Sequence, residues 1–262
     1  MHLRIDKFKM LSCALRHAAL IGVSAMALST FATPAQAIPN YVINGGFELI
    51  SNGSGGMGEF NNATYTTVSN WTSNGYNFLF VSGTADTTGG TGTFGNLKLW
   101  GPNDGSANGL PASSPTGGNY VAADGNFQVA AISQMINGLT IGNKYSVDFW
   151  WAGAQQSGFN GITTEQWQVS LGSQTQSTVI VTNASHGFTG WVHQTFTYTA
   201  TSTSELLSFL AVGTPTGVPP FVLLDGVSVT DATPEPGSLA MMLGGLGLIG
   251  LGALRSRKWS RK

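Results

Sequence analysis

Cysteine and arginine are missing from most of this chain. The only cysteine is Cys13, and between residues 38 and 232 there is no arginine and the only lysines are Lys98 and Lys144. Two lysines against ten Asp and Glu residues give this stretch a net charge of −8. An acidic surface repels phosphate backbones, which excludes nucleic acid as an expected partner. Without disulfides, the stretch must be held by packing, alone or together with a metal ion.

Groups that carry catalysis are also scarce in this stretch. His186 and His193 are its only histidines, and it has neither a cysteine nucleophile nor a Gly-x-Ser-x-Gly turn. The letters of residues 90–95, GTGTFG, fit a dinucleotide-binding pattern, but no helix is expected after them, so we interpret them as a chance match. Acids such as Glu59 and Glu165 have no spacing that predicts a catalytic pair. The sequence therefore predicts a protein that is not an enzyme.

The stretch does contain hydrophobic alternation with a period of two. From Tyr145 to Trp151 and from Trp167 to Leu171, large apolar residues alternate with mostly polar ones, as half-buried strands do. Turn signals such as Asn137-Gly138 separate the runs, and no long amphipathic helix is visible. We predict one all-β domain over residues 38–232, an antiparallel β-sandwich of the jelly-roll type.

Two segments do not follow the strand pattern and are predicted to be loops. One is Ser51 to Asn62, and the other is Thr84 to Gly118, which is rich in Gly, Thr, Ser, Asn and Pro. We expect the second to be a long loop over one rim of the sandwich.

Both ends of the chain have the pattern of transport signals. At the start, a basic leader and an apolar stretch from Ala18 to Phe31 are followed by Ala35-Gln36-Ala37, the small-x-small pattern after which signal peptidase cuts. Residues 1–37 are therefore predicted to be a signal peptide, with a buried helix as the alternative. Cys13 would leave with it, and the mature protein would be exported.

The last thirty residues combine three features in a fixed order. Pro234-Glu235-Pro236 is followed by an apolar run at 237–254 and by a basic end, 255–262, whose residues include Arg255, Arg257 and Lys258. Eighteen apolar residues are long enough to span a bilayer as a helix, and the basic end favours the cytoplasmic side. Residues 233–262 resemble the PEP-CTERM sorting tail, which implies processing by an exosortase-type membrane protease. This tail is also catalogued as the C-terminal segment of ice-binding proteins.

Landmarks spread over the domain resemble galactose-binding-like jelly rolls and carbohydrate-binding modules. They include Asn44 to Glu48, Gly118 to Ala122, Gly138 to Tyr145 and Leu224 to Val229. The resemblance implies that Glu48 and Asp225 help to hold a structural calcium ion, which would need further oxygen ligands. The alternative is that Glu48 is an exposed charge at a strand end and Asp225 caps a turn.

An aromatic platform is the expected ligand site. Trp151 and Trp167 are in phase with the predicted core, whereas Trp150 faces the opposite way beside Asp148, where an indole and a carboxylate would suit a sugar ring. The alternative is that the long loop covers Trp150. The other candidate sugar-binding residues are three loop aromatics and two glutamines that would share the face if their strands are neighbours: Trp71, Tyr76, Trp100, Gln166 and Gln168.

Together these observations predict an exported, non-enzymatic surface or matrix protein that binds extracellular polysaccharide. The membrane would hold it through the C-terminal helix before processing. A structural or adhesive component of a biofilm matrix without a ligand site is the alternative. A secreted glycoside-active enzyme and an ice-binding protein are less favoured, the latter because the threonines do not repeat at a fixed period.

Overall fold

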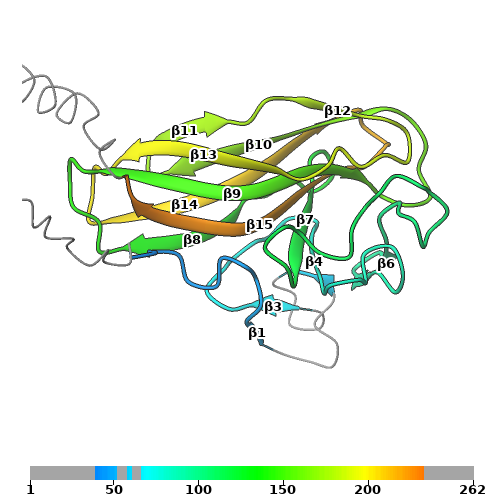
Figure 1. The fold of residues 1–262 in the computed structure, drawn as a ribbon, viewed down its shortest axis with the longest axis horizontal. Coiled ribbons are helices and arrows are strands. Elements are labelled where there is room, and N and C mark those ends of the chain that lie inside the picture. Colours follow the sequence, from blue (N-terminus) through cyan, green and yellow to red (C-terminus); the bar gives the residue numbers. More distant parts are fainter. Residues whose placement is uncertain (1–38, 52–57, 61–65, 233–262) are drawn as a thin grey trace, which may run out of the picture. The chain divides into compact units, whose positions relative to one another are not determined.

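The computed structural model describes residues 39–51, 58–60 and 66–232, and within these ranges the regular structure is all strand (Figure 1). Two large sheets pack against each other, and every strand pairing in them is antiparallel except the short one between β2 and β5. This confirms the predicted antiparallel β-sandwich. The predicted signal peptide and the predicted sorting tail lie outside the described residues. No helix in the described ranges is long and apolar enough to cross a membrane.

The smaller sheet has five strands in the order β11-β10-β14-β8, and β12 also pairs with β10. These strands are β8 (Ile132–Asn137), β10 (Thr163–Leu171), β11 (Gln174–Ser177), β12 (Val181–Asn183) and β14 (Ser204–Thr214). The long pairing of β10 with β14 places Trp167 opposite Ala211.

The larger sheet has eight strands in the order β13-β9-β15-β7-β4-β2-β5-β6. Its strands are β2 (Gly58–Glu59), β4 (Asn77–Phe80), β5 (Gly90–Gly92), β6 (Gly95–Leu97), β7 (Tyr120–Asp124), β9 (Lys144–Gln155), β13 (Val192–Thr199) and β15 (Pro220–Asp231). A separate pair is formed by β1 (Ile50–Ser51) and β3 (Thr67–Val68). The register of β15 against β9 shifts between Asp225 and Ser228, where Gly226 has a φ of +60°.

The main core lies between the two sheets. The apolar residues of β9 that alternate in the sequence, from Tyr145 to Trp151, point into it, and Trp167 and Phe209 meet them from the smaller sheet. Burying this apolar surface is the dominant stabilising term for a domain without disulfides. The prediction that Trp151 and Trp167 are core residues is confirmed.

A second core lies on the outer side of the larger sheet. Phe78, Phe80 and Phe221 belong to a second cluster, which also includes Leu99 and Leu110 from the segment predicted as a long loop. The alternation of β9 accordingly ends near Trp151, and its last residues are buried on both faces. The segment 84–118 is more ordered than a plain loop because it contains β5 and β6, and β2 lies within the other predicted loop.

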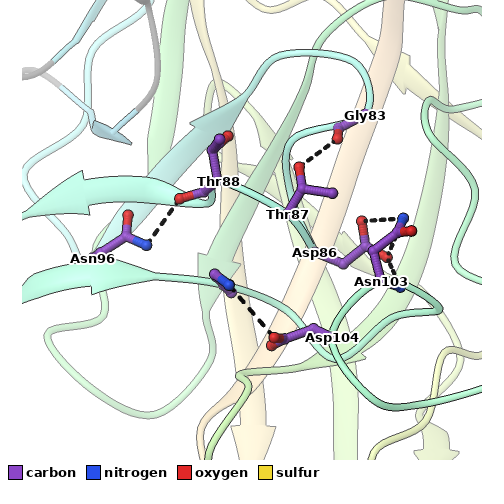
Figure 2. A network of polar contacts seen from close by, with 8 residues as sticks. Gly83, Asp86, Thr87, Thr88, Asn96, Asn103 and Asp104 are labelled. Carbon is purple, nitrogen blue, oxygen red and sulfur yellow. Dashed lines mark hydrogen bonds and ion pairs between the residues drawn. The ribbon is translucent and has the colours of Figure 1, made fainter.

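Polar contacts fasten this segment to itself (Figure 2). Asp86 accepts hydrogen bonds from the backbone N of Asn103 at 2.9 Å and from its Nδ2 at 3.1 Å. Lys98 Nζ lies 3.5 Å from Asp104 Oδ1. One of the two lysines of the domain is therefore engaged in an ion pair within the segment.

Candidate functional site

A cleft of about 480 Å³ opens where β7 and β9 end and β15 begins. This volume lies within the usual range for small-ligand sites. Its lining residues come from the start of β4, the β5–β6 hairpin and the segments that follow β7 and β9 or precede β15: Tyr76, Phe94, Asn96, Asp124, Asn126, Phe127, Gln156, Phe159, Thr216, Gly217 and Pro219.

The walls of the cleft are aromatic. Phe94, Phe127 and Phe159 are 62%, 45% and 36% exposed, which is unusual for phenylalanine, whereas Tyr76 is buried beneath them. The ring of Tyr76 meets that of Phe127 edge-on with centroids 5.3 Å apart, and Phe94 and Phe127 meet at 5.6 Å. An exposed aromatic group of this kind marks a binding surface more often than a packing accident.

A buried carboxylate completes the cleft. Asp124 is 1% exposed, and its Oδ1 accepts hydrogen bonds from the backbone N of Asn126 at 2.8 Å and of Phe127 at 3.0 Å. Its Oδ2 has no hydrogen-bond partner among the described residues. Burial raises the pKa of Asp124 to about 6, although the two backbone donors oppose the rise. Burial therefore works against the charged form of this side chain, and one of its oxygens is unsatisfied by the described residues.

A second carboxylate holds the hairpin that carries Phe94. Glu59 Oε2 accepts a hydrogen bond from the backbone N of Thr93 at 2.6 Å. Burial first, and then the charges of Glu59 and Asp124, raise the pKa of Tyr76 to about 12. The cleft is therefore negative as well as aromatic.

Side chains behind the cleft fix its rim. Trp100 Nε1 donates to the carbonyl of Phe159 at 2.9 Å, and the indole stacks on His186 with centroids 4.0 Å apart. Asn96 Nδ2 donates to the carbonyl of Thr88 at 2.9 Å (Figure 2). Of the predicted sugar-binding residues, Tyr76 lines this cleft and Trp100 supports it.

Trp150 and Asp148 lie on the outer face of the larger sheet, as the alternation predicts. Both are half-buried, and Trp150 lies beside His193 with ring centroids 5.1 Å apart. Asp148 Oδ1 accepts from Thr195 Oγ1 at 2.5 Å and is 3.8 Å from His193 Nε2. This indole and carboxylate form a second polar-aromatic surface, which is separate from the residues of the cleft.

Three predicted site residues do not lie on the face of Trp150. Trp71 is 2% exposed and packs in the main core, with its Nε1 donating to the carbonyl of Asn44 at 2.9 Å, so it has no surface for a ligand. Gln166 and Gln168 are on β10, which pairs with β14 in the smaller sheet and not with β9. The condition under which the two glutamines would share the face of Trp150, neighbouring strands, is therefore not met, because β10 and β9 belong to different sheets.

Glu48 and Asp225 are brought together on the outer side of the larger sheet. Both side chains lie next to Gly46: a Cβ atom at that position would be 3.8 Å from Glu48 Cγ and 3.9 Å from Asp225 Oδ1. Glu48 Oε1 accepts from the backbone N of Asn119 at 2.7 Å. The hydroxyls of Ser114 and Thr116 donate to Asp225 Oδ2.

The chemistry of this pair fits a cation. Asp225 is fully buried, and its Oδ1 has no hydrogen-bond partner in the part of the chain that the structure describes. Burial raises its pKa to about 6, with a smaller contribution in the same direction from the charge of Glu48. Two neighbouring carboxylates with a free oxygen are hard ligands of the kind that calcium prefers. No cluster of three or more His, Cys, Asp or Glu side chains in the described ranges is arranged to hold a metal, so carbonyl and water oxygens would have to complete a shell.

Sequence reasoning missed most of the cleft. Phe94, Phe127 and Phe159 are isolated in turns, and in the sequence Asp124 is only the first residue of an Asp-Gly pair, which indicates a turn. Five separate segments supply the lining, so no local pattern identifies it. Phenylalanines within glycine- and asparagine-rich turns were the available signal, because a turn offers little core in which to bury them.

Comparison with known protein families identifies one motif, at the C-terminal end of the chain. Residues 232–258 match the PEP-CTERM protein-sorting motif, which confirms the resemblance of the C-terminal tail. A search of curated proteins found no match to the chain.

Solved structures similar to the chain include carbohydrate-binding modules. TmCBM61, solved with β-1,4-galactotriose, is 21% identical with a TM-score of 0.39, over 74% of this chain and 99% of that chain. The C-terminal family 22 module of Clostridium thermocellum Xyn10B is 14% identical with a TM-score of 0.34, over 64% and 89%. The K3 adhesin domain of Lys-gingipain from Porphyromonas gingivalis is 11% identical with a TM-score of 0.38, over 62% and 93%. With TM-scores below 0.5, these similarities identify no ligand for this chain.

Proposed function

We propose that this chain is an exported, non-enzymatic protein whose β-sandwich binds extracellular polysaccharide through the aromatic cleft. One observation carries the proposal: three exposed phenylalanines surround a buried carboxylate that has an unsatisfied oxygen. Aromatic rings offer flat apolar surfaces to the C–H faces of sugar rings, and carboxylate and amide groups accept or donate hydrogen bonds to sugar hydroxyls.

The ends of the chain define where this binding would take place. The PEP-CTERM motif supports export followed by exosortase-type processing. Under this proposal signal peptidase removes residues 1–37, the apolar run at 237–254 tethers the protein in the membrane before processing, and the product reaches the cell surface or matrix. Fractionation of cells that express the chain with an internal tag would test this. Recovery of the full-length product in the cytosol would contradict it.

We further propose that Glu48 and Asp225 hold a structural calcium ion. Bound calcium would neutralise the buried carboxylate of Asp225 together with the exposed carboxylate of Glu48, and would connect the N-terminal segment to β15. Its role would be to stabilise the sandwich, since neither residue lines the cleft.

Binding assays on matched variants test the site. We expect Phe127→Ala to weaken the affinity for the polysaccharide about tenfold, or about 1.4 kcal/mol, because it removes a central ring of the cleft. Trp150→Ala is the control, since that indole lies outside the cleft lining. Loss of binding in Trp150→Ala with full binding in Phe127→Ala would move the site to the outer face of the larger sheet.

A glycoside-active enzyme is the rival function, because Glu59 and Asp124 both act on Tyr76 electrostatically and could form a carboxylate pair. Incubation of the purified chain with the polysaccharide that it binds, followed by analysis of reducing ends, separates the two. Release of oligosaccharides that stops in Asp124→Asn would establish the enzyme and refute the non-enzymatic proposal.

A further inference from the structure

The charge of the cleft distinguishes one class of sugar from the others. Asp124 contributes a buried carboxylate whose Oδ2 has no hydrogen-bond partner in the described part of the chain. Glu59 adds a second negative charge close to Tyr76. Burying a charged oxygen without a hydrogen-bond partner costs free energy. A ligand that compensates this charge should therefore bind more tightly than a ligand that only fills the cleft.

Among the described residues, no lysine or arginine is paired with this carboxylate. Lys98 and Lys144 are the only basic side chains other than histidine between residues 38 and 232. Lys98 is paired with Asp104, and Lys144 begins β9, whereas the cleft lies where that strand ends. The missing positive charge would have to come from the ligand.

The aromatic rings favour the same kind of ligand. Tyr76, Phe94 and Phe127 pack edge to face around the cleft, and Phe159 adds a fourth ring. Ammonium groups are attracted to the faces of aromatic rings, and a cage of rings with a carboxylate is a common solution for binding them. A uronic acid, in contrast, would bring a second carboxylate next to Asp124.

Resting on the polysaccharide-binding function proposed above, we infer that the cleft prefers amino sugars with a free, protonated amine. The amine would pair with the carboxylate of Asp124, which lines the cleft, and the sugar ring would stack on the phenylalanines. A charge-assisted hydrogen bond is about twice as strong as a neutral one, which gives a preference over N-acetylated or neutral sugars.

Three oligosaccharides of equal length test the inference on the full chain by calorimetry. They are the β-1,4-linked hexamers of glucosamine, N-acetylglucosamine and glucose. We expect the glucosamine hexamer to bind at least tenfold more tightly than the other two. In Asp124→Asn this preference should fall below threefold, while Asp231→Asn, which removes one charge outside the cleft, should keep it.

Each outcome has a distinct meaning. Equal or tighter binding of the glucose or N-acetylglucosamine hexamer would overturn the amine preference and leave the polysaccharide-binding function standing. If none of the hexamers binds and a wider glycan array is also negative, the proposed function fails as well. A preference that persists in Asp124→Asn would show unspecific attraction of a polycation to an acidic protein and would overturn the inference. If Asp124→Asn does not fold, the comparison of the three hexamers on the unaltered chain, together with Phe127→Ala, decides the matter.

Discussion

Glu165 offers a quantitative test of the electrostatics of the sandwich. Its side chain on β10 is fully buried, Oε1 accepts a hydrogen bond from Thr163 Oγ1 at 2.5 Å, and Oε2 has no partner in the described ranges. Burial raises the pKa of Glu165 from 4.5 to about 7, against the opposing hydrogen bonds of Thr163 and Asn183. A raised pKa is common in glycosidase acids, but Glu165 is not among the cleft residues, so we assign the rise to burial alone.

The expected consequence is a loss of stability as the pH rises. The unfolded chain holds Glu165 at its ordinary pKa of 4.5 and the folded chain at about 7, so folding takes up a proton between these values and stability falls across that window. A difference of about 2.5 in pKa corresponds to about 3 kcal/mol. Glu165→Gln removes this dependence because the amide does not titrate.

Urea denaturation from pH 4.5 to pH 8 measures the effect. We expect the free energy of unfolding to fall by about 3 kcal/mol more in the unaltered chain than in Glu165→Gln. Asp124 and Asp225, whose pKa values are also raised, titrate in both proteins and cancel in the comparison. Parallel pH profiles for the two proteins would refute the assignment of a buried, weakly compensated carboxylate.

Two further predictions concern stability. Calcium at about 100 times its dissociation constant should raise the melting temperature by roughly 5 to 10 °C, since it would stabilise the native state by about 2.7 kcal/mol. A chelator or the variant Glu48→Gln should abolish the rise. An unchanged melting curve with and without chelator would remove Glu48 and Asp225 from the metal assignment. Trp71→Ala should lower the free energy of unfolding by about 3 to 5 kcal/mol, whereas Phe94→Ala should change it by less than about 0.5 kcal/mol. Similar losses for the two variants in urea denaturation would contradict the burial of the Trp71 ring and the exposure of the Phe94 ring.

The fold could be predicted from the sequence where burial is one-sided. The alternation from Tyr145 to Trp151 is readable because one face of β9 packs in the main core and the other is half-exposed. From Ala152 onward both faces of β9 are buried, because the outer face packs in the second core with residues of the segment 84–118. The small residues there show no alternation of apolar and polar side chains. Sheet membership is also a tertiary property, which is why the sequence left open whether the strands of Gln166 and Trp150 are neighbours; they belong to different sheets.

The two candidate sites differ in how far the sequence predicted them. A family resemblance pointed to Glu48 and Asp225, and the fold brings both side chains next to Gly46 although they are far apart in the chain. The cleft had no such guide, because Asp124 is defined as a site residue by its burial and by the oxygen left without a partner. Neither property is visible in an Asp-Gly turn.

The most direct test of polysaccharide binding through the cleft is a crystal structure of the protein with a tightly bound oligosaccharide. The account predicts a sugar ring stacked against Phe127 or Phe159, with a polar group of the sugar directed at the carboxylate of Asp124. An oligosaccharide bound instead over Trp150 and Asp148, with the cleft filled only by water, would contradict it.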